Sequence, residues 1–211
     1  MVCLQTHEKS AYSILPTVST TQTRLRKVKE TMAKYTMDMV LEYAKVFPEN
    51  ADMGDPDGAQ WQKDLANKGG QYLVNAYFTD QEQIDQLVAD GLQTVILGNP
   101  RIIEGNAEYG IGKYLKLKRP VPDVIKTFEN KGKEVEVNYG GAPGVVDLRD
   151  PENKRWWSYE EDGALGNGTK AKVQFEVYSR GAGVRLINVG VTELVEYVPQ
   201  ANEDDELFKV A

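Results

Sequence analysis

Residues 169–198, TKAKVQFEVYSRGAGVRLINVGVTELVEYV, carry the clearest structural pattern in the chain. Between residues 170 and 177, apolar side chains occupy the odd positions, and polar side chains, including Lys170 and Lys172, occupy the even positions. Alternation with a period of two is typical of a β-strand that buries one face. A second run rich in valine, leucine and isoleucine follows from Gly183. The segment therefore predicts two neighbouring strands, the first with a cationic outer face.

Shorter patterns extend the β prediction toward the N-terminus. Residues 35–43 alternate, with Tyr, Met and Leu on one face and Thr, Asp and Glu on the other. Many short strands separated by Gly, Asn and Pro favour a small, largely closed β-barrel or a sandwich over a parallel α/β sheet. Further extended segments are expected at 94–97, 113–118, 133–139, 144–148 and 156–159.

Helical signals are concentrated in a segment of about 58–91, which we interpret as a helical insertion. One helix is expected at 58–67. Thr79 and Glu82 have the spacing of a capping box before an apolar stripe, so they predict the start of a second helix. A single helical turn is expected within 122–130.

Length and composition describe one ordinary globular domain. The chain has 211 residues, of which 41% are hydrophobic and 27% charged. It shows no internal repeat. We therefore predict a single domain at 1–198, followed by a flexible acidic tail at 199–211.

The scarcity of histidine and cysteine limits the chemistry. The chain has one of each, His7 and Cys3. This composition excludes a zinc site of the usual kind, a Ser-His-Asp triad of ordinary form and a disulfide framework. We expect no catalysis, no metal and no cofactor, although the many carboxylates leave a magnesium-dependent nuclease open. No signal-peptide core or membrane-length apolar run is present, so we expect a cytoplasmic protein without membrane contact.

Charge is distributed unevenly along the chain, whose formal net charge is −7. Residues 113–133 hold seven lysines and arginines against two acids, and residues 24–34 hold five against one. Four consecutive acids occupy 203–206. Local potential steers a charged ligand more than net charge does, so this distribution favours a polyanion such as nucleic acid. Ordinary solvated charged faces are the alternative.

Aromatic residues lie within or beside the basic segments. Cations that follow phosphates, together with rings on which bases stack, are the mixture that single-stranded nucleic acid requires. Barrel core is the alternative role for each ring. Candidate phosphate contacts are Lys116, Lys118, Lys170, Lys172, Arg180, Arg185, Arg26 and Lys27. Candidate stacking rings are Tyr114, Trp156, Trp157, Tyr159 and Tyr178.

The order of motifs in the second half of the chain resembles that of a known family. A Val-Val-Asp turn at 145–147 precedes a charged loop with two tryptophans, a Gly-x-Gly turn and the Lys-x-Lys-Val strand. KYLKLK at 113–118 and AKYTMDMVLEY at 33–43 add a central basic strand and an early strand. Together these segments resemble the single-stranded DNA-binding proteins of the T-odd short-tailed bacteriophages. Residues 49–92 have no clear counterpart there, and the family's acidic tail is longer.

The resemblance implies an oligonucleotide-binding (OB) fold with an added helix. It also implies sequence-tolerant binding of single-stranded DNA that protects and organises strands during phage DNA replication and recombination, in the cytoplasm of the infected bacterial host. The tail would dock on replication proteins such as polymerase and helicase-primase, and a homodimer is also open. Alternatives are a phage structural or assembly protein and a carboxylate-dependent nuclease. The tail residues concerned are Glu203, Asp204, Asp205, Glu206, Leu207 and Phe208.

Overall fold

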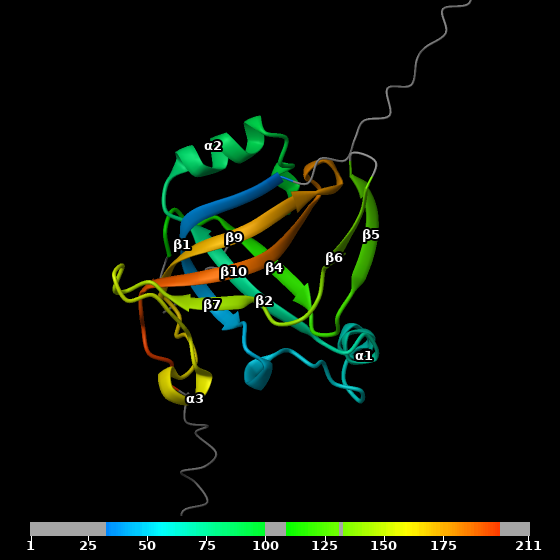
Figure 1. Cartoon of the computed structure of the whole chain (residues 1–211), viewed down its shortest axis with the longest axis horizontal. Coiled ribbons are helices and arrows are strands. Elements are labelled where there is room, and N and C mark those ends of the chain that lie inside the picture. The colour runs from blue at the N-terminus through cyan, green and yellow to red at the C-terminus, as the bar shows by residue number, and fades with distance from the viewer. Residues whose placement is uncertain (1–32, 100–108, 131–132, 199–211) are drawn as a thin grey trace, which may run out of the picture.

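The computed structural model describes residues 33–99, 109–130 and 133–198, and it shows a mainly β molecule (Figure 1). One mixed sheet has eight strands in the order β3 (Leu97–Gly98), β4 (Tyr114–Pro120), β2 (Gln71–Phe78), β1 (Ala33–Lys45), β9 (Lys170–Tyr178), β10 (Gly183–Glu193), β7 (Gly144–Asp147) and β8 (Arg155–Trp156). A separate hairpin, which we call the arm, consists of β5 (Ile125–Asn130) and β6 (Lys133–Asn138). The prediction of a mainly β fold is confirmed.

Strand β1 lies in the middle of the sheet and is antiparallel to both β2 and β9. The chain returns from β9 as β10, and β7 runs parallel to β10. The alternation predicted for β9 is confirmed, because Val173 and Phe175 are buried whereas Lys170 and Lys172 are exposed. The apolar face of β9 joins those of β1, β2, β4 and β10 in one core.

Helices and short turns connect the strands. The α-helices are α1 (Gln60–Asn67), α2 (Gln81–Ala89) and α3 (Tyr159–Asp162), and the 3-10 turns are η1 (Pro48–Asn50), η2 (Thr94–Ile96) and η3 (Ser179–Gly181). The two predicted helices are confirmed, but Asp80 rather than Thr79 caps α2. Its carboxylate accepts a hydrogen bond from the Gln83 N–H at 3.0 Å. Within the described ranges, none of these helices has the length and apolar character needed to cross a bilayer.

Three predictions of secondary structure are wrong. Residues 71–78, inside the expected helical insertion at about 58–91, form β2 between the two helices. This strand is flanked by β1 and β4 and is buried on both faces, so its sequence is a nearly continuous apolar run without alternation. Residues 125–130, within the expected helical turn, form β5, and residues 94–96, an expected strand, form η2.

The alternation predicted for β1 ends at a β-bulge. Tyr43 has a φ of 51°, and the register with β2 shifts between Glu42 and Lys45. The bulge turns Tyr43 to solvent, although the pattern placed it on the buried face. Glu42 is buried, and its carboxylate accepts hydrogen bonds from the Tyr77 hydroxyl at 2.8 Å and the Asn75 amide at 3.2 Å.

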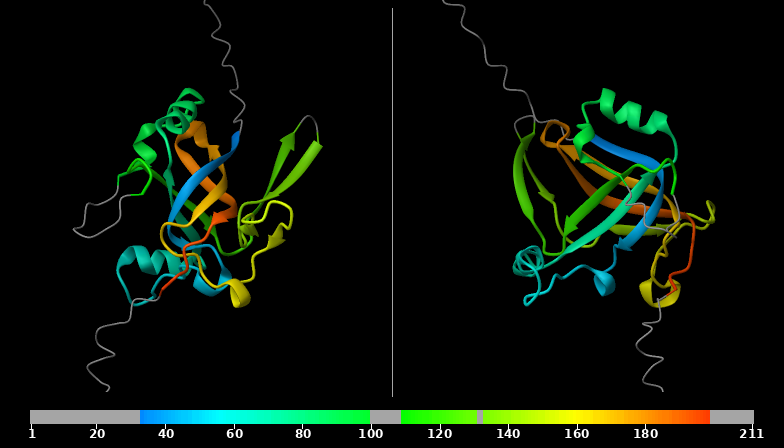
Figure 2. Two further views of the ribbon diagram at one scale, coloured as in Figure 1. Left: turned by 90° about the vertical axis from the view of Figure 1, so that its left-hand side faces the viewer. Right: turned by 180° about the vertical axis from the view of Figure 1, so that it is seen from behind.

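Hydrogen bonds do not close the sheet between β4 and β10. The Cα atoms of the two strands come within 8 Å of each other. Among the described strands, however, residues 116–120 pair with β2 alone and residues 183–187 pair with β9 alone. Two strand edges therefore face each other across an opening. The arm projects away from the main sheet, as the left view of Figure 2 shows.

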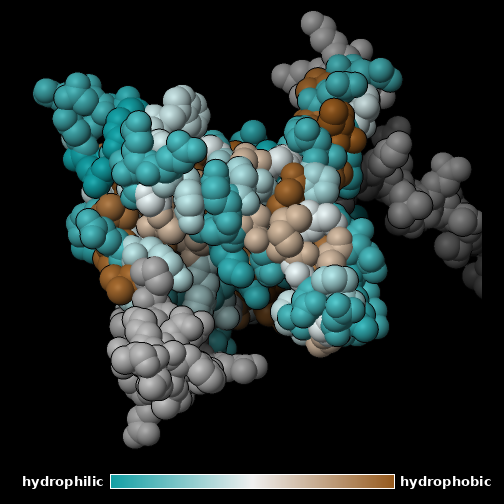
Figure 3. Space-filling view, turned by 90° about the horizontal axis from the view of Figure 1, so that it is seen from below, coloured by the Kyte–Doolittle hydropathy of each residue, from teal (hydrophilic) through white to brown (hydrophobic). Residues whose placement is uncertain are grey.

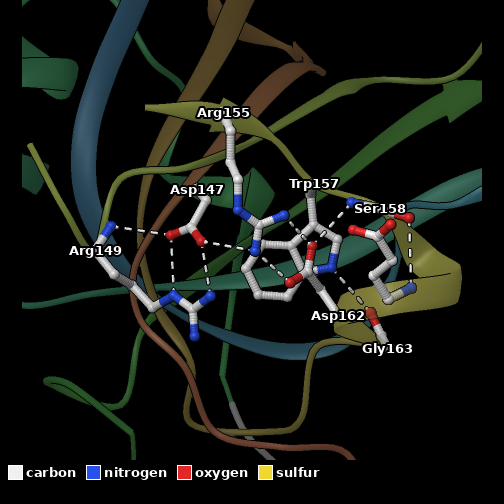
Figure 4. A network of polar contacts seen from close by, with 8 residues as sticks. Asp147, Arg149, Arg155, Trp157, Ser158, Asp162 and Gly163 are labelled. Atoms are coloured by element: carbon white, nitrogen blue, oxygen red, sulfur yellow. Dashed lines mark hydrogen bonds and ion pairs between the residues drawn. The ribbon is translucent and has the colours of Figure 1, made fainter. Parts of the chain in front are cut away.

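Ion pairs around Asp147 join β7, β8 and α3 (Figure 4). The buried Asp147 carboxylate accepts a hydrogen bond from Arg149 Nη2 at 2.7 Å and lies 3.3 Å from Arg155 Nη2. Arg155 also pairs with Asp162, whose carboxylate accepts the backbone N–H of Ser158 at 3.0 Å. The hydrogen bond from Arg149 holds the pKa of Asp147 at about 2, below its ordinary value of 3.8.

Acid should weaken this network. Because the folded pKa of Asp147 is about 2, its ionised form stabilises the fold above about pH 4, and this contribution is lost as the pH falls toward 2. We expect Asp147→Asn to lower the free energy of unfolding at pH 7 by about 1.5–3 kcal/mol, the range for hydrogen bonds to charged groups. Urea denaturation between pH 2 and 7 measures the effect, with exposed Glu160→Gln as the control. A deficit that stays equally large at pH 2 would contradict the assignment.

Candidate functional site

A groove of about 830 Å³ occupies the opening between β4 and β10. One side carries β4 residues from Lys116 to Pro120, and the other carries Val184 and Arg185 at the start of β10. The arm region contributes Lys126 and Tyr139. The starts of β1 and β2, the ends of α1, α2 and β9, and η3 complete the lining. In Figure 1 these elements lie on the right-hand side of the molecule.

The lining is strongly cationic, so we call it the basic groove. Asp90 is the one carboxylate among the described residues that line it, and that group accepts a hydrogen bond from the Tyr35 hydroxyl at 3.2 Å. Within the described part of the chain, Arg185 alone of the lining cations forms an ion pair. The lining cations are Lys68, Lys116, Lys118, Arg119, Lys126, Arg180 and Arg185.

Strand β4 presents its lysines through simple alternation. Leu115 and Leu117 are buried in the core, which leaves Lys116 and Lys118 exposed on the other face. Burial, together with the neighbouring charge of Lys116, lowers the pKa of Lys118. The charge of Asp52 acts in the opposite direction, but neither lysine forms an ion pair within the described residues. A bound anion would reduce the repulsion between the two ammonium groups.

Arg185 is the most buried cation of the groove. Its guanidinium pairs with the buried Glu176 carboxylate and lies 3.8 Å from the centre of the Tyr139 ring. Its Nε is buried and has no hydrogen-bond partner among the described residues. Lys34 approaches the other oxygen of Glu176 at 3.6 Å. Arg185 therefore positions the ring of Tyr139 and contributes little uncompensated charge.

Arg119 fastens the arm to the main sheet. Its Nε donates to the Gly140 and Gly141 carbonyl oxygens at 2.9 and 2.8 Å, and its Nη2 donates to Gly140 at 2.6 Å. Burial lowers the pKa of Arg119, and the nearby charge of Arg185 lowers it further. Gly140 tolerates no side chain, because a Cβ there would lie 1.7 Å from the Pro122 carbonyl oxygen. The base of the arm is thus fixed beside β4.

The two faces of the arm differ. Lys126 and Val137 are cross-strand partners on one face, and the Lys126 ammonium lies 5.2 Å from the centre of the Tyr139 ring. Thr127 and Glu136 are partners on the other face. Seen from below in Figure 3, the arm projects at the upper right and carries hydrophobic residues, whereas hydrophilic residues dominate much of that surface.

The turn between β9 and β10 closes the other end of the groove. Ser179 and Arg180 have φ of 50° and 55°, which few residues other than glycine adopt. Gly181 follows with a φ of 82°, and a Cβ there would lie 1.8 Å from the Gly91 carbonyl oxygen. This packing holds the strained turn, so Arg180 and the 38% exposed Tyr178 border the groove.

The structure brings some of the predicted contacts together and separates others. Lys116, Lys118, Arg180, Arg185 and Tyr178 line the basic groove. Lys170 and Lys172 do not line the groove. Each forms an ion pair on the outer face of the sheet: Lys170 Nζ lies 2.8 Å from a Glu193 oxygen, and Lys172 Nζ lies 2.8 Å from an Asp38 oxygen. Candidates that lie outside the described residues are Arg26, Lys27, Glu203, Asp204, Asp205, Glu206, Leu207 and Phe208.

Four predicted stacking rings lie outside the groove. Trp157 is buried, donates from Nε1 to the Gly163 carbonyl at 3.0 Å and is covered by Arg149, so its ring belongs to the core. Tyr159 packs against Phe47, and Tyr114 packs against Tyr77. Trp156 is 73% exposed on β8 but does not line the groove.

Several groove residues were not among the candidates. Lys68, Arg119, Lys126 and Tyr139 line it, and Lys126 and Arg119 belong to the basic segment 113–133 that the charge count identified. Their convergence depends on the arm, which the sequence did not predict as a hairpin. Lys68 directly follows α1. No pattern in the sequence indicates which side of that helix borders the groove.

Comparisons with known proteins identify no relative. No protein-family model, curated protein sequence or solved structure matches the chain. Within the described ranges, three or more His, Cys, Asp or Glu side chains nowhere gather in a way that could hold a metal ion. Any assignment of function therefore depends on the groove itself.

Loss of the Arg119 hydrogen bonds should loosen the arm. We expect Arg119→Ala to raise the amide hydrogen-exchange rate of residues 124–139, because the Gly140 and Gly141 carbonyls lose a charged donor worth about 1.5–3 kcal/mol. Lys118→Ala, the neighbouring substitution on β4, removes no such bond and is the control. Equal exchange in the two variants would show that Arg119 does not hold the arm.

Proposed function

We propose that the chain binds single-stranded DNA in the basic groove, without preference for sequence. The observation that carries the proposal is the set of seven lining cations, of which Arg185 alone forms an ion pair within the described residues. Ion pairs of the kind that neutralise Lys170 and Lys172 on β9 are missing from the rest of this set. Unpaired cations along one groove fit a phosphate backbone, which carries regularly spaced negative charge.

Rings beside the cations favour a single strand over a duplex. Tyr178 and Tyr139 both line the groove. Base stacking on an aromatic ring requires a base with an open face, which single strands offer and a duplex does not. Stacking is tolerant of sequence because every base has such a face.

The strand pairing supports an OB-like barrel. An OB-fold is a five-stranded, partly open Greek-key barrel, and in a Greek key the first strand pairs with the second and has the fourth strand beside it. Here β1 pairs with β2 and β9, and β7 runs parallel to β10. Strands β4 and β7 together take the place of the third strand, with the arm inserted between them.

The position of the groove fits the same interpretation. OB-folds bind oligonucleotides with their second and third strands and with the loops that follow the first and fourth strands. The basic groove is lined by β4, by the end of α1 in the connection from β1 to β2, and by η3 in the connection from β9 to β10.

The biological setting follows from the sequence resemblance alone. We propose a role in phage DNA replication and recombination, without catalysis or a cofactor, in the infected bacterial cytoplasm. Docking on replication proteins is assigned to residues 199–211, which lie outside the described residues. A structural or assembly protein and a carboxylate-dependent nuclease are the competing functions.

Titration with oligo-dT tests the proposal. Single-strand affinity should fall with log salt by about 0.7 per phosphate neutralised, so three to six engaged cations give a slope of roughly −2 to −4. The expected loss of affinity between about 50 and 200 mM salt is on the order of 10- to 250-fold. Equal affinity for duplex, or a flat salt response, would falsify the proposal. Magnesium-dependent loss of the strand would favour the nuclease, and absence of binding would favour a structural role.

Matched lysine substitutions test the location of the site. Lys116→Ala and Lys118→Ala should each weaken binding to every sequence and make the salt slope shallower by about 0.7. Lys172→Ala is the control, since Asp38 already neutralises that ammonium, and its slope should equal that of the unmodified protein. If Lys172→Ala lowers the slope as much as Lys116→Ala does, DNA follows the outer face of β9 instead of the groove.

A further inference from the structure

Trp61 lies on α1 with 63% of its surface exposed. Leu65 and Lys68, which follow it by four and seven residues, both line the basic groove. Residues at these spacings share one face of a helix, and their Cβ atoms lie about 5–6 Å apart from one turn to the next. Trp61 therefore extends the face of α1 that borders the groove.

Gly54 and Asp64 border the face of α1 that carries Trp61. Gly54 packs so closely on the helix that a Cβ there would lie 2.4 Å from the Gln62 carbonyl oxygen, 2.7 Å from the Ala66 nitrogen and 3.1 Å from the Leu65 Cβ. Asp64, the acid of the helix, lies three residues after Trp61 and four before Lys68, so it borders the same face, and its carboxylate accepts a hydrogen bond from the Gln60 side chain at 2.8 Å. This face of α1 thus combines an exposed ring with a cation, beside one hydrogen-bonded carboxylate.

We propose that Trp61 is a base-stacking residue at the α1 end of the basic groove, so the site accepts a nucleotide with an unpaired base there. The inference rests on the function proposed above. Lys68 and the β4 lysines hold the phosphates while the neighbouring base lies on the indole. Tyr178 borders the groove at its opposite end, next to η3. Rings at both ends make the preferred ligand a strand whose bases are unstacked, which a duplex does not provide.

Paired oligonucleotides separate stacking from other roles of the ring. The full chain and Trp61→Ala are titrated with oligo-dT and with an abasic oligonucleotide of the same length, which keeps the phosphates and lacks the bases. We expect Trp61→Ala to bind oligo-dT about 5- to 150-fold more weakly, and to bind the abasic strand as tightly as the unmodified protein does. The salt slope should not change, since no cation is removed.

Trp156→Ala is the matched control, because Trp156 is also largely exposed but lies on β8, no residue of which lines the groove, and the variant should bind both strands normally. Fluorescence gives a second readout: Trp61→Phe should lose the quenching by oligo-dT that Trp156→Phe retains. Normal oligo-dT binding by Trp61→Ala, or an equal loss on both oligonucleotides, overturns the stacking role. If Lys116→Ala weakens binding while Trp61→Ala does not, only this inference fails. If the unmodified chain binds neither strand, the proposed function fails with it.

Discussion

The opening between β4 and β10 is the constraint on which the proposed site depends. Two strand edges that approach but exchange no hydrogen bonds leave backbone donors and acceptors that need other partners. In place of strand pairing, side chains from both strands bind the base of the arm: Arg119 of β4 donates to the Gly140 carbonyl at 2.9 Å, and Arg185 of β10 reaches the Asn138 carbonyl at 3.4 Å. Long cationic side chains therefore bridge a gap that strand pairing leaves open. Under the proposed function, the same side chains would bind phosphates.

Concentrating cations in this opening is unfavourable for the free protein, and the structure compensates only partly. Arg185 is compensated by Glu176, and Arg119 by neutral carbonyl oxygens. Neither Lys116 nor Lys118 forms an ion pair among the described residues. Burial and the charge of Lys116 lower the pKa of Lys118, and the charge of Asp52 opposes that shift only in part. Ion pairs with acidic residues would remove this electrostatic cost. On β9, Lys172 forms such a pair with Asp38, its cross-strand partner on β1. Binding of phosphates would stabilise the charges that folding leaves uncompensated.

Sequence patterns predicted those features that depend on local spacing. The buried and exposed faces of β9 and β4 follow from alternation, and the charge count over 113–133 located most of the groove's cations. Strand β2 was missed because a strand buried on both faces has no alternation, and its apolar run is flanked by helical signals. Pairing of Lys170 and Lys172 with acids depends on strand register, which joins residues more than a hundred positions apart in the case of Lys172. Trp61 was not among the predicted stacking rings, because helical spacing in the sequence does not show which face of α1 lies beside the groove.

The net charge of −7 acts together with the groove rather than against it. Some exposed carboxylates face away from the lining cations, such as Glu136 on the face of the arm opposite Lys126, whereas Asp52 and Asp123 lie close enough to act on Lys118 and Arg119. If the groove binds DNA as proposed, a phosphate backbone that leaves it would be repelled by these acids within about one Debye length. Under that proposal, acidic surroundings would restrict a flexible polyanion to one path, and a negative net charge would be compatible with DNA binding in a defined position.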